Sequence, residues 1–395
     1  MTKPGPLLYF MPRFRAPDGR GRLGNSRISW VALNLALTPC PLAARNLLER
    51  FREPGAILSA GAGALAEVPG VTPRLAARLR DPRLLETAAA EMRSAERQSV
   101  RILIRDDPEY PGILAQLPDP PPLLYVRGSL REGDDPAVAV VGSRRATPYG
   151  LEMARSLAAE IASAGVVVVS GLARGIDEAA HRGALEAGGR TLAFLGSGID
   201  RLYPPESRRL AGTIAANGAV LSEFPLGTAP LPGHFPVRNR LISGICRGTV
   251  VVEAAPRSGS LITARLALEQ GREVFAVPGN ATARNALGPN FLIQQGAKLV
   301  MRGRDVLEEI PGVVLPQEPS GKGREEEEGV LEGEAARILS RVPADEPIGL
   351  DDLAAKTGMA AGPLLGALLD LEMKDRVSRL PGRRFIRRRR RSERG

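Results

Sequence analysis

Short loops rich in glycine, serine and arginine follow apolar runs at several places in the chain. The clearest is Ser170-Gly171-Leu172-Ala173-Arg174-Gly175, which comes directly after four valines at 166–169. The backbone N–H groups of such a loop, the positive end of a following helix and a nearby guanidinium together favour an anion. Glycine also lets a phosphate approach the main chain closely. These residue types therefore predict a phosphate-binding loop.

The same arrangement recurs after the apolar runs at 137–141, 191–195 and 249–253. A further segment, Phe235-Pro236-Val237-Arg238-Asn239-Arg240, is expected to place two arginines at the start of a helix, where acidic residues are the usual choice. An anionic ligand is the simplest reason for this reversal. Phe235 could stack on an unpaired base or could instead cap the apolar core. The predicted DNA-binding residues are Gly142, Ser143, Arg144, Arg145, Ser170, Gly171, Arg174, Gly175, Ser197, Gly198, Arg201, Phe235, Arg238, Asn239, Arg240, Arg257 and Ser258.

Apolar runs of strand length alternate with helical patterns through the middle of the chain. The β-branched residues at 166–169 suit a strand buried on both faces, and Asp177 is expected as the N-cap or first-turn acid of the next helix. This alternation predicts an α/β, doubly wound, Rossmann-like sheet, whose loops gather at the carboxyl ends of the strands. None of the loops has the dinucleotide fingerprint or the lysine of a P-loop.

The residues that usually carry catalysis are scarce. The chain has two histidines, His181 and His234, and no Cys, His, Asp or Glu cluster with metal-ligand spacing. His181 is expected to be a packed or capping residue. Glu253 could act as a general base, although pairing with Arg257 or another arginine is the favoured role. We therefore expect no catalytic residues, no metal and no cofactor, and the protein is not expected to be an enzyme.

The net charge of +10 is concentrated at the two ends of the 395-residue chain. Residues 1–27 carry +5 and residues 383–395 carry +7, so the rest of the chain carries −2. Local arginine placement, rather than overall charge, must therefore support a nucleic-acid site. Two distant cysteines and the lack of an 18-residue apolar run predict a cytoplasmic protein without disulfides or a membrane partner.

Composition and periodicity divide the chain into six parts. We predict a disordered basic tail at 1–27, a helical domain at 28–97 that is similar to SAM or helix-hairpin-helix modules, and an extended Rossmann-like domain at 98–312. An acidic linker at 313–333 leads to a winged-helix domain at 334–387 and an arginine-rich tail at 388–395. The hairpin at 65–79 could contact DNA or be purely structural. The third helix of the winged helix shows few basic or amide side chains, so protein binding is as well supported as DNA reading.

The motifs of the Rossmann-like part resemble the DNA processing protein A (DprA, or Smf) family. The resemblance rests on segments in a fixed order, which are Val141-Gly142-Ser143-Arg144, residues 170–177, Gly196-Ser197-Gly198-Ile199-Asp200-Arg201-Leu202-Tyr203-Pro204, Ser222-Glu223-Phe224-Pro225, residues 235–240, residues 257–264 and Val277-Pro278-Gly279. It implies a homodimer, formed through the Rossmann-like domain, that protects single-stranded DNA and loads the RecA recombinase during natural transformation. It also implies phosphate contacts by Arg144, Arg238 and Arg240.

The resemblance leaves two differences and one alternative. This chain has no lysine between Lys3 and Lys298, where many members carry lysines, and Ser207 stands where the family often has asparagine. The alternative is a nucleotide-binding, Rossmann-like enzyme of the phosphoribohydrolase type. Such an enzyme would need a catalytic carboxylate in or just after a glycine-rich loop, and residues 256–263 contain none.

Overall fold

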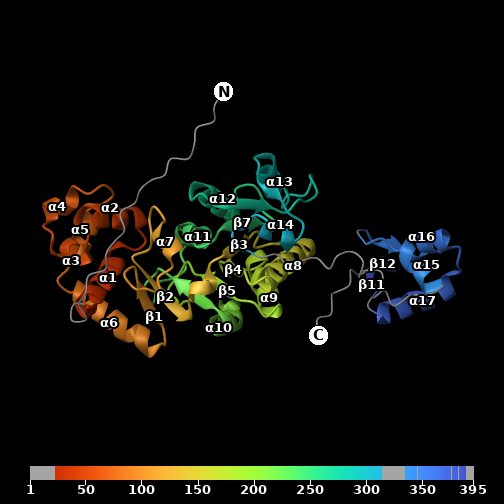
Figure 1. Cartoon of the computed structure of the whole chain (residues 1–395), viewed down its shortest axis with the longest axis horizontal. Coiled ribbons are helices and arrows are strands. Elements are labelled where there is room, and N and C mark those ends of the chain that lie inside the picture. The colour runs from red at the N-terminus through yellow and green to blue at the C-terminus, as the bar shows by residue number, and fades with distance from the viewer. Residues whose placement is uncertain (1–22, 314–333, 345, 375, 381, 388–395) are drawn as a thin grey trace, which may run out of the picture. The chain divides into compact units, whose positions relative to one another are not determined.

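The computed structural model describes residues 23–313, 334–344, 346–374, 376–380 and 382–387. The chain forms two compact units, Met1–Leu315 and Pro316–Gly395 (Figure 1). Among the described helices, none is long and apolar enough to cross a membrane. The predicted acidic linker, apart from residue 313, and the two predicted tails, apart from residues 23–27, lie outside the described residues.

A nine-stranded sheet in the order β1-β2-β6-β5-β4-β3-β7-β8-β9 organises the first unit (Figure 1). The seven strands from β6 to β9 in this order are parallel, whereas β1 and β2 are antiparallel additions at one edge. The bounds are β1 Arg101–Ile104, β2 Leu123–Gly128, β3 Ala137–Val141, β4 Val167–Ser170, β5 Thr191–Phe194, β6 Ala219–Ser222, β7 Gly248–Val251, β8 Glu273–Ala276 and β9 Lys298–Leu299. Strand order reverses at β3, which confirms the Rossmann-like prediction.

Helices cover both faces because alternate strand residues point to opposite sides. Val138 and Val140 pack with the helices α8, α9 and α14, whereas Ala139 and Val141 pack on the opposite face with α7, α11 and α12. The bounds are α7 Gly112–Ala115, α8 Pro148–Ser163, α9 Ile176–Glu186, α10 Arg208–Asn217, α11 His234–Gly244, α12 Gly259–Glu269, α13 Leu287–Gln294 and α14 Gly303–Leu307. Both faces of the central strands are therefore fully buried, as their valine-rich sequence predicts.

The N-terminal helical region shares a core with the sheet. Trp30 and Leu33 belong to the same apolar cluster as Tyr125, Ala193 and Val220 of the strands. The helices are α1 Leu23–Leu37, α2 Pro41–Phe51, α3 Pro54–Ser59, α4 Ala62–Ala66, α5 Pro73–Leu79 and α6 Leu84–Arg97. The helical region is therefore built onto the β5–β6–β2 part of the sheet and does not have a core of its own.

Two details of this region refine the sequence predictions. Helix α1 begins at Leu23, inside the range predicted as a disordered tail, and Arg27 pairs with Asp107 at 2.6 Å. That tail boundary was wrong because the apolar periodicity used to find the helix starts one turn later than the helix itself. The predicted hairpin is formed by α4 and α5, and the Thr72 hydroxyl caps α5 by accepting from Leu75 N at 3.3 Å.

The second unit contains three helices around a small core with a three-stranded sheet, consistent with the predicted winged helix. The helices are α15 Glu334–Arg341, α16 Leu350–Thr357 and α17 Ala361–Met373, and the strands are β10 Ile348–Gly349, β11 Val377–Leu380 and β12 Arg384–Arg387. Strands β11 and β12 form a hairpin, and β10 adds a short third strand beside β12. Two residues are too few to give a period-2 pattern, so this strand had no sequence signal.

Candidate nucleic-acid interface

The predicted loops meet at the carboxyl edge of the sheet. The loop after β4 packs on the loop after β3, because Ile176 N donates to Ser143 O at 3.2 Å. Gly175 makes this contact possible: its φ is 82°, and a Cβ at this position would lie 2.3 Å from Ser143 O. A side chain here would push the two loops apart. The Gly-Ser-Arg loop and the Ser-Gly-Leu-Ala-Arg-Gly loop, which the sequence predicted to gather at this edge, therefore do contact each other.

Two backbone amides of the loop after β4 donate to a carboxylate of the protein. Asp177 lies in the first turn of α9, and its Oδ2 accepts from Gly171 N at 3.2 Å and Ala173 N at 3.4 Å. Burial raises the pKa of Asp177, while the Arg238 charge and these amides oppose that shift. Asp177 therefore takes up two of the loop's amides, and phosphate binding by the rest of the loop stays a prediction.

Glu253 fills a second such position, at the switch point between β3 and β7. Its Oε2 accepts from Thr147 N at 2.9 Å and from Asn285 Nδ2 at 3.2 Å, so the carboxylate sits at the N-terminus of α8. A Cβ on Gly150 would lie only 2.4 Å from this carboxyl group. Among the described residues, Glu253 thus pairs with backbone, hydroxyl and amide donors, and not with Arg257 or another arginine as the sequence suggested.

Two of the predicted phosphate contacts, Arg238 and Arg240, are buried inside α11. This helix begins at His234, so both arginines lie in its second turn and not at its start, which corrects the prediction. Arg238 Nη1 donates to Gly171 O at 2.8 Å and also to Phe194 O, and burial lowers the pKa of Arg238 to about 10. The guanidinium therefore ties together the loops after β4 and β5.

Arg240 has carboxylate partners of its own. It forms a buried ion pair with Glu223, and its Nε lies 3.4 Å from Asp119 Oδ2. Asn239 between the two arginines donates to Gly259 O at 3.3 Å, which links α11 to α12. The expected phosphate role of Arg240 therefore does not fit its position, because its charge is neutralised within the protein.

The exposed part of the edge centres on a cluster of Arg144, Phe235 and Tyr203. The Arg144 Cζ lies 5.0 Å from the centre of the half-buried Phe235 ring, and the Tyr203 ring lies 6.0 Å from it. Tyr203 is 45% exposed. Gly196 backs Phe235 closely, since a Cβ there would lie 3.0 Å from the ring. Tyr203 was missed as a site residue, although it belongs to the Tyr-Pro motif that carries the family resemblance.

The remaining predicted residues divide into exposed arginines and structural serines and glycines. Arg144, Arg145, Arg174, Arg201 and Arg257 are exposed, with Arg174 paired to Glu206 and Arg201 lying 4.0 Å from Asp200. The predicted serines hold backbone groups: Ser143 accepts from Arg145 N, Ser170 donates to Val140 O, Ser197 donates to Arg201 O and Ser258 caps α12. Gly142 and Gly198 are required by close packing.

Two family models match the chain. The model described as DNA recombination-mediator protein A matches residues 101–311, and a DprA winged-helix model matches residues 323–383. The chain belongs to the DprA family. A Protein Smf from Synechocystis sp. is 34% identical to this DprA-family chain over 391 residues, which cover 91% of this chain and 98% of the relative.

Solved structures of other DprA proteins match as well. The X-ray structure of DNA processing protein A from Streptococcus pneumoniae is 36% identical, with a TM-score of 0.59, and the match covers 71% of this chain and 98% of that one. A Helicobacter pylori DNA processing protein A, whose structure is described as giving insights into its single-stranded DNA binding mode, is 32% identical with a TM-score of 0.48. That match covers 52% of this chain and 93% of the other.

Within the described residues of this DprA-family chain, no three Cys, His, Asp or Glu side chains are grouped so that they could hold a metal ion. His181 is buried, and its Nδ1 lies 2.7 Å from Thr191 Oγ1. The Thr191 hydroxyl donates to Val168 O, so it accepts from His181 Nδ1–H. His181 is thus a packed residue, as the sequence suggested.

Proposed function

We propose that this DprA-family protein binds single-stranded DNA across the carboxyl edge of its sheet and acts there as a recombination mediator. The observation that carries this proposal is the cluster of Arg144, Phe235 and Tyr203. Aromatic rings stack on unpaired bases of any sequence, and neighbouring guanidinium groups attract the phosphates. The exposed Arg145 and Arg257 extend the positive charge along the same edge, where Arg174 and Arg201 also lie but have Glu206 and Asp200 as neighbours.

The internal carboxylates favour a strand over a free nucleotide as the ligand. Asp177 and Glu253 occupy the amide positions where a Rossmann-like protein would hold a phosphate of a nucleotide. The exposed arginine and aromatic side chains therefore supply most of the proposed contacts, and because each contact is weak, several nucleotides are needed for tight binding. Glu253 is also committed to the N-terminus of α8, which disfavours its use as a catalytic base. We accordingly propose a binding protein and not an enzyme of the phosphoribohydrolase type.

Membership of a recombination-mediator family supports a role in handing the bound strand to a recombinase. We propose RecA as that partner, natural transformation as the process and the cytoplasm as the location. A mediator needs to hold a strand without reading its sequence, and stacking combined with charge provides this.

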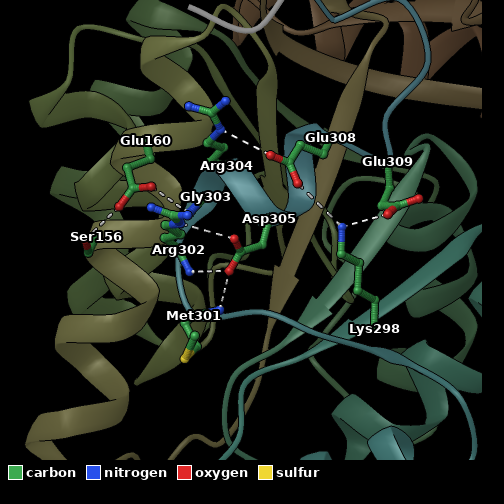
Figure 2. A network of polar contacts seen from close by, with 10 residues as sticks. All are labelled: Ser156, Glu160, Lys298, Met301, Arg302, Gly303, Arg304, Asp305, Glu308 and Glu309. Atoms are coloured by element: carbon green, nitrogen blue, oxygen red, sulfur yellow. Dashed lines mark hydrogen bonds and ion pairs between the residues drawn. The ribbon is translucent and has the colours of Figure 1, made fainter. Parts of the chain in front are cut away.

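We also propose that two copies associate through the β9 edge of the sheet. Large apolar side chains are exposed there, on or beside β9 and α13: Leu287, Phe291, Leu299 and Met301. Figure 2 shows that the neighbouring polar network is satisfied internally, by contacts such as Lys298 with Glu309 at 2.6 Å and Gly303 N with Glu160 at 2.7 Å, while the Met301 side chain points away from it. An apolar surface beside a short edge strand is suited to a second copy. A Leu299→Arg variant is expected to sediment as a monomer.

The strand-binding proposal is tested by fluorescence anisotropy with a labelled oligo-dT, with a hairpin duplex and thymidine monophosphate as competitors. We expect the single strand to bind most tightly, the duplex more weakly, and the mononucleotide to compete only poorly. Equal binding of single strand and duplex, or tight binding of the mononucleotide, would contradict the proposal.

A further inference from the structure

Glu91 links the helical region to the loop that precedes α11, the helix with the stacking aromatic. It lies on α6, and its Oε1 accepts from Leu226 N at 2.7 Å. Leu226 belongs to the loop between β6 and α11, the helix that contains Phe235. A side chain of the helical region therefore holds a segment that leads directly into the proposed DNA site.

The next amide of the same loop is held from the opposite side. Gly227 N donates to both carboxylate oxygens of Asp200, at 2.8 and 3.0 Å, and Gly198 N donates to Thr228 O at 2.9 Å. Asp200 and Gly198 lie in the loop after β5, which continues to Tyr203. Consecutive amides at 226 and 227 are thus held by carboxylates of two different regions, and the loop that leads to α11 is joined to the loop that carries Tyr203.

Other contacts make this connection rigid. Asn34 of α1 donates through Nδ2 to Glu223 O at 3.1 Å, which fixes the beginning of the loop to the helical region. The Leu226 side chain packs against the apolar core that α1–α6 share with the sheet. Burial and the nearby Asp200 charge raise the pKa of Glu91, while the Leu226 amide opposes that shift. The hydrogen bond to Leu226 therefore helps to stabilise an ionised side chain in a poorly solvated position.

We propose that the helical region is part of the DNA-binding apparatus and that Glu91 is its positioning residue. By holding Leu226, Glu91 fixes the start of α11 and thus the position of the Phe235 ring relative to Arg144 and Tyr203. This inference rests on the proposed function, because it concerns the same strand-binding site. Glu91 itself does not contact the DNA.

The first experiment compares variants of Glu91 in oligo-dT binding. Glu91→Ala removes the acceptor, and affinity is expected to fall about five- to tenfold because the Phe235 ring is no longer held in its binding position. Glu91→Met also removes the acceptor but fills the space, and the same loss of affinity is expected. This variant keeps the test valid where the alanine variant folds poorly. Glu91→Gln keeps an oxygen acceptor and should stay near wild-type affinity. Glu96→Ala, an exposed change on the same helix, is the control and should have no effect.

A double-mutant cycle with Phe235→Ala tests whether Glu91 acts through the aromatic ring. If it does, Glu91→Met weakens binding in the wild-type background and adds little once Phe235 is absent. Fully additive effects, or an unchanged affinity of Glu91→Met, would overturn the inference. Failure of the wild-type protein to bind oligo-dT would instead count against the proposed function, so the two failures are distinguishable.

Discussion

Arg144 is exposed, and its guanidinium lies over the Phe235 ring. It is therefore the arginine best placed to contact the phosphate next to a stacked base. Arg144→Ala is expected to weaken oligo-dT binding strongly and to leave the fold intact. Loss of one phosphate contact should also reduce the slope of log affinity against log salt by about 0.7. Anisotropy titrations at several salt concentrations measure both quantities. Arg83→Ala, an exposed arginine change in the helical region, is the control, and an Arg144→Ala protein with unchanged affinity and slope would contradict the assignment.

Phe235 can be assigned to stacking or to the core by a second substitution. The ring is only half-buried, between Gly196, Arg144 and Tyr203, so its removal should cost less stability than the roughly 3–5 kcal/mol expected for a core phenylalanine. Base stacking contributes about 1–3 kcal/mol, so Phe235→Ala is expected to weaken oligo-dT binding by about tenfold. A large fall in Tm with affinity preserved in the folded fraction would assign the ring to the core.

Arg238 and Arg240 show why sequence alone did not predict the burial of these two arginines. Their identity as arginines was informative, but their role depends on where α11 begins and on carboxylates far away in sequence, at Asp119, Asp177 and Glu223. A sequence pattern does not distinguish an arginine that is available to a ligand from one that is paired with a carboxylate of the protein. Arg144, by contrast, follows a strand directly, so its place at the carboxyl edge could be predicted.

At the scale of elements, the parallel strands were predicted well because short runs of β-branched, apolar residues favour strands buried on both faces. The expected run at 137–141 coincides with β3, and the run at 191–195 differs from β5 by one residue. The start of α1 and the short strand β10 were missed because their residues lack an apolar period. The start of α11 was misplaced because His234, Phe235 and Pro236 do not look like a first helical turn, although proline is tolerated there.

His181, on α9 beside Thr191 of β5, makes the stability of the fold depend on pH. Burial lowers the pKa of His181 to about 3, whereas an unfolded histidine titrates near 6.5. The unfolded chain therefore takes up a proton below about pH 6.5 that the folded chain does not bind, so stability falls as the pH falls through that window. At pH 5 the loss is expected to be about 2 kcal/mol relative to pH 7. Urea unfolding at both pH values measures it, with His181→Gln as the control that should lose correspondingly less.

At the scale of the whole molecule, the helical region and the sheet form one unit, while the chain from Pro316 onward forms another. The sequence predicted separate helical and Rossmann-like domains because their periodicities differ. The shared core could not be predicted in this way, since it depends on Trp30 and Leu33 meeting strand residues such as Tyr125 and Val220 about a hundred or more positions away. The first unit, which contains every residue of the proposed DNA site, is therefore the smallest part of the chain expected to bind DNA.

The last prediction follows from this division. The segment at 313–333 includes four consecutive glutamates and no apolar periodicity, so limited proteolysis is expected to cut there. The N-terminal fragment should keep its affinity for oligo-dT within about twofold at 0.15 M salt, where weak contacts from the arginine-rich tail are largely screened. A chain that begins at residue 98 should instead lose its fold, because it lacks the helices that complete the core. If the longer fragment folds but no longer binds oligo-dT, the site lies in the winged helix or the arginine-rich tail, and the assignment to the carboxyl edge of the sheet is wrong.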